Sequence, residues 1–110
     1  MKYGESRAVS RFIRKITVEN LWIYVLSLLK EEPVYGYEIR DKIFKKFNFK
    51  PGKITCYVVL YKLEREGLIS SKEIDEKSRG APRRYYTITD KGLRELERAK
   101  KFLKVILSSI

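Results

Sequence analysis

The chain has 110 residues, within the range of a single domain, and its 25 lysines and arginines outnumber 14 aspartates and glutamates, giving a formal net charge of +11. This balance favours a polyanionic partner, with nucleic acid first and an anionic membrane surface second. The sequence has no histidine and a single cysteine, Cys56, so it lacks an internal disulfide, the usual zinc ligands and the commonest general base. We therefore expect no metal, no cofactor and no enzymatic activity.

No N-terminal segment has the pattern of a secretory signal, and the longest apolar run, residues 21–29, is too short to span a bilayer. These observations predict a cytoplasmic protein that does not enter membranes. Cys56 is expected to be a small buried hydrophobe and not a redox switch, because the chain holds no second thiol to pair with it.

The first 16 residues predict a short basic amphipathic helix ahead of the main domain. Its apolar and basic positions alternate at helical spacing: Val9, Phe12, Ile13 and Ile16 among Arg7, Arg11, Arg14 and Lys15. Two interpretations stay open. The helix could grip phosphates or a membrane surface, or it could pack its apolar stripe on a C-terminal dimerisation helix, which is the commoner use of such a stripe.

Two helices and a turn are expected next. Thr17 is predicted to cap a helix that runs to residue 29 and ends before Pro33. Tyr35-Gly36-Tyr37 opens another helix, and residues 48–52 form a polar turn with Pro51 and Gly52. The positions predicted to be buried on these two helices are Leu21, Val25, Leu28, Leu29, Ile39, Ile43, Phe44 and Phe47.

A helix over about residues 54–66 follows the turn and is predicted to end at Gly67. Its apolar side is assigned to Ile54, Leu60, Leu63 and Leu68, which leaves Thr55, Tyr57, Tyr61 and Lys62 facing outward. A helix, a turn and a second helix in this order are typical of a helix-turn-helix protein, with the second helix reading DNA.

Residues 68–75 and 83–89 are rich in β-forming side chains, and the stretch between them contains Ser78, Gly80 and Pro82. This pattern predicts a hairpin with a basic tip, the wing of a winged helix. Tyr85 and Tyr86 occupy adjacent strand positions, so they are expected to face opposite sides, one of them in the core.

The last helix, capped by Thr89 or Asp90, carries a continuous apolar stripe that no earlier segment obviously covers. A twofold dimer built on this helix would bury it, and packing within one chain is the alternative. The predicted dimer interface consists of Leu93, Leu96, Ala99, Leu103, Ile106, Leu107 and Ile110. The expected organisation is an N-terminal extension (1–16), a winged helix-turn-helix domain (17–89) and a dimerisation helix (90–110).

The chain from about residue 26 to 103 resembles the PadR-like family of winged helix-turn-helix transcriptional regulators. The residues that carry the resemblance are Leu28-Leu29, Gly36-Tyr37-Glu38-Ile39, Tyr57, Leu60, Leu63-Glu64, Gly67-Leu68-Ile69, Arg84-Tyr85-Tyr86, Thr89 and Gly92. The resemblance implies a mainly helical fold with a small β-hairpin, and a homodimeric repressor. It implies a recognition helix in the major groove, a wing along the backbone, and in many members a response to small hydrophobic or phenolic compounds.

The predicted DNA contacts fall into three groups. On the recognition helix they are Lys53, Thr55, Tyr57, Tyr61 and Lys62, because polar groups on its first turns reach phosphates and base edges. On the wing they are Lys77, Arg79, Arg83 and Arg84, with a solvated charged hairpin as the alternative. Weaker backbone contacts are assigned to Lys42, Lys45, Lys46 and Lys50, for which solvated lysines are the alternative.

The sequence thus predicts a sequence-specific, dimeric transcriptional regulator that binds double-stranded DNA, with Trp22 as a candidate surface for a planar effector or as a core residue. Because no arginine faces outward on the front turns of the recognition helix, low-specificity architectural DNA binding is one alternative. A winged-helix module for protein or RNA interaction is another, which a charge-neutral outer face on the recognition helix would favour.

Overall fold

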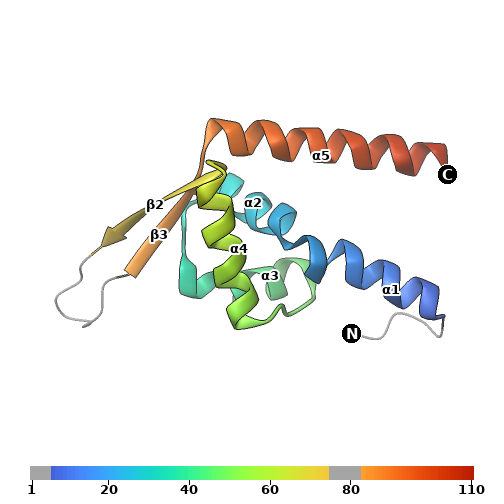
Figure 1. Ribbon diagram of the computed structural model, residues 1–110, viewed down its shortest axis with the longest axis horizontal. Helices are drawn as coiled ribbons and strands as arrows, with labels where there is room; N and C mark the ends of the chain where they lie inside the picture. Colours follow the sequence, from blue (N-terminus) through green and yellow to red (C-terminus); the bar gives the residue numbers. More distant parts are fainter. Residues whose placement is uncertain (1–5, 75–82) are drawn as a thin grey trace.

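The computed structural model describes residues 6–74 and 83–110, and its elements are arranged as in Figure 1. The fold is mainly helical with a small antiparallel sheet, which confirms the predicted winged helix-turn-helix architecture. In chain order the elements are α1 (Arg7–Ile16), η1 (Val18–Asn20), α2 (Leu21–Glu31), β1 (Val34–Tyr35), η2 (Gly36–Glu38), α3 (Ile39–Phe47), α4 (Lys53–Arg65), β2 (Ile69–Ile74), β3 (Arg83–Ile88) and α5 (Asp90–Ser109).

Helix α1 projects from the body of the molecule and buries none of its residues (Figure 1). Its predicted apolar stripe is exposed, with Phe12 62% exposed, so within one chain it does not pack on α5. Thr17 was predicted to cap the helix that runs to residue 29, and that prediction is wrong for α2, whose N-cap residue is Asn20. The Thr17 hydroxyl donates to the Ile13 carbonyl oxygen (2.7 Å) at the end of α1, and the 3-10 turn η1 separates it from α2.

The core lies where α2 meets α3, α4 and the sheet. Val25, Ile39, Ile43 and Leu60 are fully buried there, as predicted, and so is Leu26, which was not assigned to the core. Two predicted core residues, Phe44 and Ile54, are exposed instead, Ile54 by 79%. Phe49 and Pro51, in the predicted polar turn, are buried in their place. The turn folds back onto the core, whereas Ile54 on the first turn of α4 stays on the surface.

The sheet has three strands in the order β1-β3-β2, so the short strand β1 joins the predicted hairpin. The residue pairs Val34↔Tyr86 and Tyr35↔Tyr85 connect β1 to β3, while Ile69↔Ile88 begins the pairing of β2 with β3. Tyr86 belongs to the core and Tyr85 points to the other side, as their adjacent strand positions predict.

The predicted end of the recognition helix is confirmed. After the cap residue Glu66, Gly67 takes a left-handed conformation with φ of 77°, which a residue with a side chain adopts at a cost. The Leu68 amide donates to the Leu63 carbonyl and the Gly67 amide to the Glu64 carbonyl (both 3.0 Å). This double closure satisfies the last carbonyls of α4 and turns the chain directly into β2.

Helix α5 starts at the predicted cap, because the Thr89 hydroxyl accepts a hydrogen bond from the Gly92 amide (3.0 Å). Gly92 lies against the backbone of Leu68, where a Cβ atom would come within 2.1 Å of the carbonyl oxygen. Leu96, predicted to lie in a dimer interface, is only 2% exposed within the single chain and belongs to its core. The apolar stripe beyond it is exposed, including Leu103, Ile106, Leu107 and Ile110.

Candidate nucleic-acid interface

Helix α4 presents an outward face formed by the predicted contact residues of the recognition helix. Lys53, Thr55 and Lys62 are exposed, Tyr57 is 44% exposed and Tyr61 61%. The opposite side of the helix packs Cys56, Leu60 and Leu63 into the core. The side chains named from helical spacing therefore lie where a DNA duplex could reach them.

Two apolar residues share this outward face and escaped the sequence analysis. Ile54 and Val58 lie one helical turn apart and are both exposed, beside Tyr57 and Tyr61. Apolar side chains at such positions can contact thymine methyl groups in the major groove. The exposure of these two residues could not be predicted from the sequence, because apolar residues occur on all sides of this helix. Periodicity alone therefore does not distinguish its buried residues from its exposed ones.

A hollow of about 320 Å³ lies beside the first turns of α4. Tyr37 and Arg40 from η2 and α3 line it together with Lys53 and Tyr57 from α4, and Cys56 lies at its inner side. Arg40 Nε donates to the Pro51 carbonyl oxygen (2.7 Å), which holds the turn before α4 against α3. Cys56 is buried, which confirms that part of its prediction. Burial raises the pKa of its thiol, and the Arg40 charge opposes this in part.

The two described arginines at the base of the wing have different surroundings. Arg83 Nη1 donates to the Tyr37 hydroxyl (2.9 Å), and its guanidinium lies 4.7 Å from the centre of the Tyr37 ring. Arg84 forms an ion pair with Glu73 (3.2 Å) on the neighbouring strand. Because the two residues are adjacent on β3, their side chains leave opposite faces of the sheet, and each is oriented by a contact within the chain. Lys77 and Arg79, predicted for the wing tip, lie outside the described residues.

A chain of polar contacts joins the recognition helix to the wing. Ser71 on β2 donates a hydrogen bond to Glu64 Oε2 on α4 (2.6 Å), and Arg84 Nη1 on β3 donates to the Ser71 hydroxyl (2.9 Å). Burial raises the pKa of the nearby Tyr86 hydroxyl, with a further contribution from the Glu64 charge. The position of the wing is therefore coupled to that of α4 through specific hydrogen bonds.

The three lysines of α3 and Lys50 in the turn after it are divided between two environments. Lys42 forms an ion pair with Glu32 (3.5 Å), and Lys46 pairs with Glu31, so these two charges are already compensated at the end of α2. Lys45 and Lys50 are exposed, and the Lys50 ammonium lies over the Phe44 ring at 5.6 Å from its centre. Of the four, Lys50 lies nearest in sequence to the start of α4.

Trp22 is half-buried at a separate hollow of about 480 Å³ between α2, α4 and the start of α5. Val59 and Leu63 contribute apolar lining, and the carboxylates of Glu66 and Glu95 lie at its border. Within residues 6–74 and 83–110 no cluster of acidic, cysteine or histidine side chains could hold a metal ion. No helix in that part of the chain has the length and apolar character needed to cross a membrane.

The recognition helix has an exposed basic and aromatic face and a buried opposite face, and a hairpin follows its C-terminal end. These features define a winged helix-turn-helix protein of the DNA-binding class. Residues 25–98 match the family model described as the transcriptional regulator PadR-like family, and the chain belongs to that family. Its members are transcriptional regulators and not enzymes.

Solved structures support the same assignment. A PadR family transcription regulator from Clostridium difficile R20291 is 32% identical over 80% of this chain and 91% of its own, with a TM-score of 0.71. A PadR family regulator from Eggerthella lenta is 30% identical over 93% and 88% of the two chains, with a TM-score of 0.79. Bacillus subtilis PadR in complex with operator DNA is 26% identical over 72% of this chain and 45% of that one, with a TM-score of 0.66.

Among curated proteins, an uncharacterized protein designated X from Lysinibacillus sphaericus is 37% identical over 70 residues. The match covers 62% of this chain and 63% of that relative, so the shared region is less than two thirds of the relative's length. This relative supports the common domain and carries no information on activity.

Proposed function

We propose that this chain is a homodimeric transcriptional repressor that binds a roughly palindromic operator, with α4 in the major groove and the wing along the DNA backbone. The observation that carries the proposal is the exposed set Lys53, Thr55 and Tyr57 on the first turns of α4. These turns belong to a stretch between Asp41 and Glu64 that contains lysines and no acid. The operator complex of Bacillus subtilis PadR, a similar structure, supports the choice of partner.

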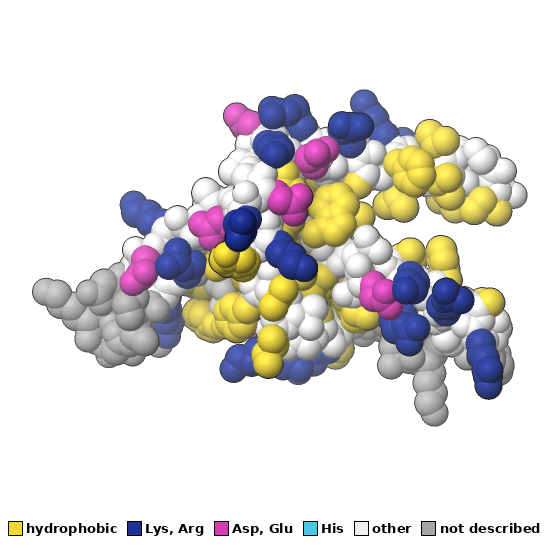
Figure 2. Space-filling model, viewed as in Figure 1, with side chains coloured by type: hydrophobic (Ala, Val, Ile, Leu, Met, Phe, Trp, Pro, Cys, Tyr) yellow, Lys and Arg dark blue, Asp and Glu magenta, His cyan; other side chains and the backbone are white. Residues whose placement is uncertain are grey.

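The exposed apolar stripe of α5 supports a dimer. Leu103, Ile106, Leu107 and Ile110 continue the line of Leu96 along the helix, yet no segment of the described chain covers them. Figure 2 shows hydrophobic side chains on the lower side of this half of α5 and on the upper side of α1, with open space between the two helices. A second copy of the chain would bury both stripes, because a twofold axis matches identical surfaces.

Trp22 is the proposed contact for a small hydrophobic or aromatic effector. Its ring borders a hollow that residues of α4 and α5 also line, so a bound planar molecule could alter the position of the recognition helix α4. Trp22 is the single tryptophan of the chain, so effector binding can be followed by its fluorescence. A compound that quenches this fluorescence and releases the protein from DNA at the same concentration supports the proposal.

A second candidate, low-specificity architectural binding, is favoured by one observation. The outward face of α4 carries Ile54, Tyr57, Val58 and Tyr61 and no arginine on its front turns, so a strong bidentate guanine contact is missing. The apolar and aromatic part of this face would suit a protein partner. Measurements of DNA binding at a defined salt concentration therefore distinguish the repressor, the architectural protein and the protein-interaction module.

The test is a salt series of binding to duplex DNA from the upstream region of the protein's own gene, compared with a scrambled duplex. Lys53→Ala is expected to flatten the salt dependence by about one unit of slope, as for one lost phosphate contact. Tyr57→Ala is expected to reduce the preference for the specific duplex. Lys101→Ala, a matched change of one exposed lysine on α5, is the control.

Preferential binding of a dimer to the specific duplex supports the repressor. Equal binding to both duplexes, unchanged when the upstream region is tiled more widely, favours the architectural function. Absence of binding to any duplex at low salt contradicts DNA binding and favours the protein-interaction function.

A further inference from the structure

Helix α1 has two distinct faces. Arg7, Arg11 and Arg14 are spaced by four and three residues and so lie along one side, here named the N-terminal basic face. Val9, Phe12 and Ile16 lie on another side and form the exposed apolar stripe. The ten residues of α1 contain no acid, so the basic face carries its charge without internal compensation.

Most of this charge has no partner among the described residues. Arg7 and Arg11 form no hydrogen bond or ion pair with the described part of the chain. Arg14 Nε lies 3.3 Å from Glu19 Oε2, but the same carboxylate accepts a 2.8 Å hydrogen bond from Lys15 Nζ. One carboxylate thus serves two cations, and the segment remains strongly positive.

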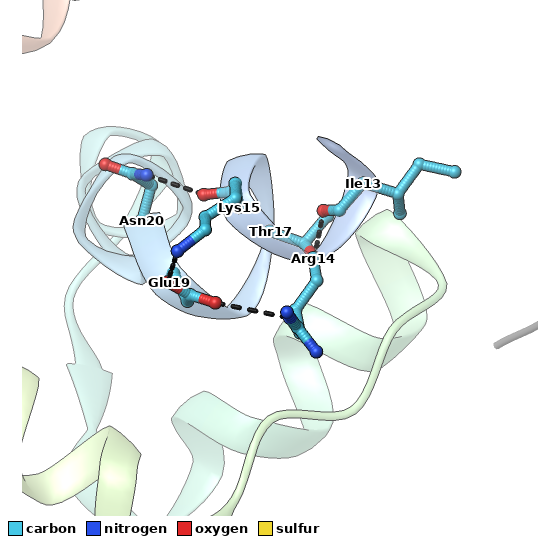
Figure 3. Close-up of polar contacts among 6 residues, drawn as sticks. All are labelled: Ile13, Arg14, Lys15, Thr17, Glu19 and Asn20. Carbon is cyan, nitrogen blue, oxygen red and sulfur yellow. Dashed lines mark hydrogen bonds and ion pairs between the residues drawn. The ribbon is translucent and has the colours of Figure 1, made fainter. Parts of the chain in front are cut away.

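The orientation of α1 is set at its C-terminal end (Figure 3). The Asn20 amide nitrogen donates to the Lys15 carbonyl oxygen (2.6 Å), and the Thr17 hydroxyl donates to the Ile13 carbonyl oxygen (2.7 Å). The Tyr24 hydroxyl of α2 donates to the Ile16 carbonyl oxygen (2.6 Å). Together with the Glu19 ion pairs, these bonds satisfy the last carbonyls of the helix and fix its direction relative to α2.

The basic side of α1 borders the approach to the recognition helix. Ser10 and Arg14 line a hollow of about 620 Å³ together with Asn48 and Lys50 of the turn before α4. Figure 3 shows Arg14 extending from α1 on the side of that turn. Lys53, the first residue of α4, follows Lys50 by three positions. Arg14 of α1 and Lys50 of the turn thus border the same hollow, and Lys50 lies three residues ahead of the start of the recognition helix.

We propose that the N-terminal basic face binds phosphates of the same DNA duplex, outside the base pairs that α4 contacts. The proposal rests on the proposed DNA-binding function and extends its footprint. Guanidinium groups suit this role because they form paired hydrogen bonds with phosphate oxygens. The three arginines span about 10 Å of helix, enough to neutralise more than one phosphate. The apolar stripe on the other side of α1 stays available for a second copy of the chain.

The experiment compares the full chain with Arg7→Ala/Arg11→Ala/Arg14→Ala in a salt series on duplexes of increasing length. The matched control is Arg94→Ala/Arg98→Ala/Lys101→Ala, which removes the same charge from the face of α5 opposite Leu96. Figure 2 shows lysine and arginine side chains along the upper edge of α5, away from the start of α4. Since none of the six residues is buried, both variants should keep the circular dichroism spectrum of the parent chain.

The expected result is a salt slope reduced by about two to three units for the α1 variant, with little change for the control. The difference should appear only on duplexes that extend beyond the shortest fragment bound by α4. An α1 variant that matches the parent chain on every duplex overturns the proposal while leaving the DNA-binding function intact. Failure of the parent chain to bind any duplex removes the proposed function and this inference with it.

A membrane surface is the competing partner for a basic amphipathic helix. It is tested by co-sedimentation with vesicles of phosphatidylcholine and phosphatidylserine. Binding to these vesicles that is lost in the α1 variant, combined with an unchanged salt slope on DNA, overturns the DNA proposal. Loss of DNA affinity without vesicle binding supports it.

Discussion

The guanidinium of Arg83 lies over the ring of Tyr37, 4.7 Å from its centre, and donates a 2.9 Å hydrogen bond to its hydroxyl. These residues are 46 positions apart in the chain and connect the wing to the turn η2. Tyr37 in turn stacks on Tyr35, with ring centres 5.7 Å apart. Arg83 is therefore held in place by aromatic side chains within the single chain.

This relationship predicts that Arg83→Lys does not replace arginine, although it keeps the charge. Lysine cannot stack its charged group flat on the ring, so we expect both Arg83→Lys and Arg83→Ala to lower the free energy of unfolding by about 0.5–1 kcal/mol. Urea denaturation of Arg83→Ala, Tyr37→Leu and the double variant measures the coupling between the two residues. Additive effects would show that the contact contributes nothing to stability.

The contact between Ser71 and Glu64 predicts a coupling of wing and recognition helix. Ser71→Ala removes the donor to Glu64 and the acceptor of Arg84, so we expect a loss of about 1 kcal/mol in stability. The affinity for the operator should fall. The dependence of that affinity on salt concentration should stay nearly unchanged, because no phosphate contact is removed. The matched control is Ser70→Ala, whose hydroxyl pairs with Thr87 away from α4. Equal losses of affinity in both variants would argue against a specific coupling.

Gly92 predicts the strongest single effect on folding. A Cβ atom at this position would lie 2.1 Å from the Leu68 carbonyl oxygen, which forces α5 away from the start of β2. We expect Gly92→Ala to cost more than about 3 kcal/mol, above the usual range for a point change. Gly67→Ala, with a positive φ but open space around it, should cost only about 1–2 kcal/mol. Thermal unfolding monitored by circular dichroism compares the two, and a similar cost for both would contradict the packing argument.

The two halves of the α5 stripe predict opposite outcomes. Leu96→Ala removes a buried side chain, so we expect a loss of about 2–5 kcal/mol in stability. Leu107→Asp changes an exposed position and is expected to leave the fold intact while producing a monomer. Light scattering after size-exclusion chromatography measures the molar mass of each variant. A parent chain that is already monomeric across micromolar concentrations would contradict the proposed dimer.

The ion pairs of Glu19 with Arg14 and Lys15 predict that the orientation of α1 is sensitive to acid. Hydrogen bonding from Lys15 is the main cause that lowers the pKa of Glu19 below the ordinary value of 4.5, with the charges of Lys15 and Arg14 contributing. A lowered pKa in the folded state means that the carboxylate stabilises the junction above about pH 4.5, and that this contribution is lost as the pH falls through the lowered pKa. The protection of the α1 amides against hydrogen exchange, measured relative to the intrinsic exchange rate at each pH, should therefore fall on acidification.

Glu19→Gln is the control for this prediction. It removes the charge at every pH, so the protection of the α1 amides relative to the intrinsic exchange rate should be lower than in the parent chain at neutral pH and should change less on acidification. Identical acid responses in the parent chain and the variant would assign the effect to other groups.

The local pattern of residues in the sequence determined the order of the elements and most of the residues on the outward face of α4. The spacing of Tyr57 and Tyr61 against Leu60 and Leu63 sorts α4 into an outer and an inner side, because residues three and four apart share a helical face. Gly67 marks the end of α4, since a left-handed residue is needed where the helix turns into a strand. These features depend on neighbours within a few residues and can be inferred without the fold.

Tertiary structure alone decided which apolar residues have a partner. Phe49 is buried in a turn that looked polar, while Ile54 is exposed on a helix whose pattern suggested burial. Strand β1 forms because Val34 and Tyr35 meet β3 about fifty residues later in the chain, too short a segment to be recognised alone. The pairing of Arg83 with Tyr37 and the burial of Leu96 likewise depend on segments far apart in sequence. Periodicity assigns a side chain to a face, but only the packed chain determines what lies opposite that face.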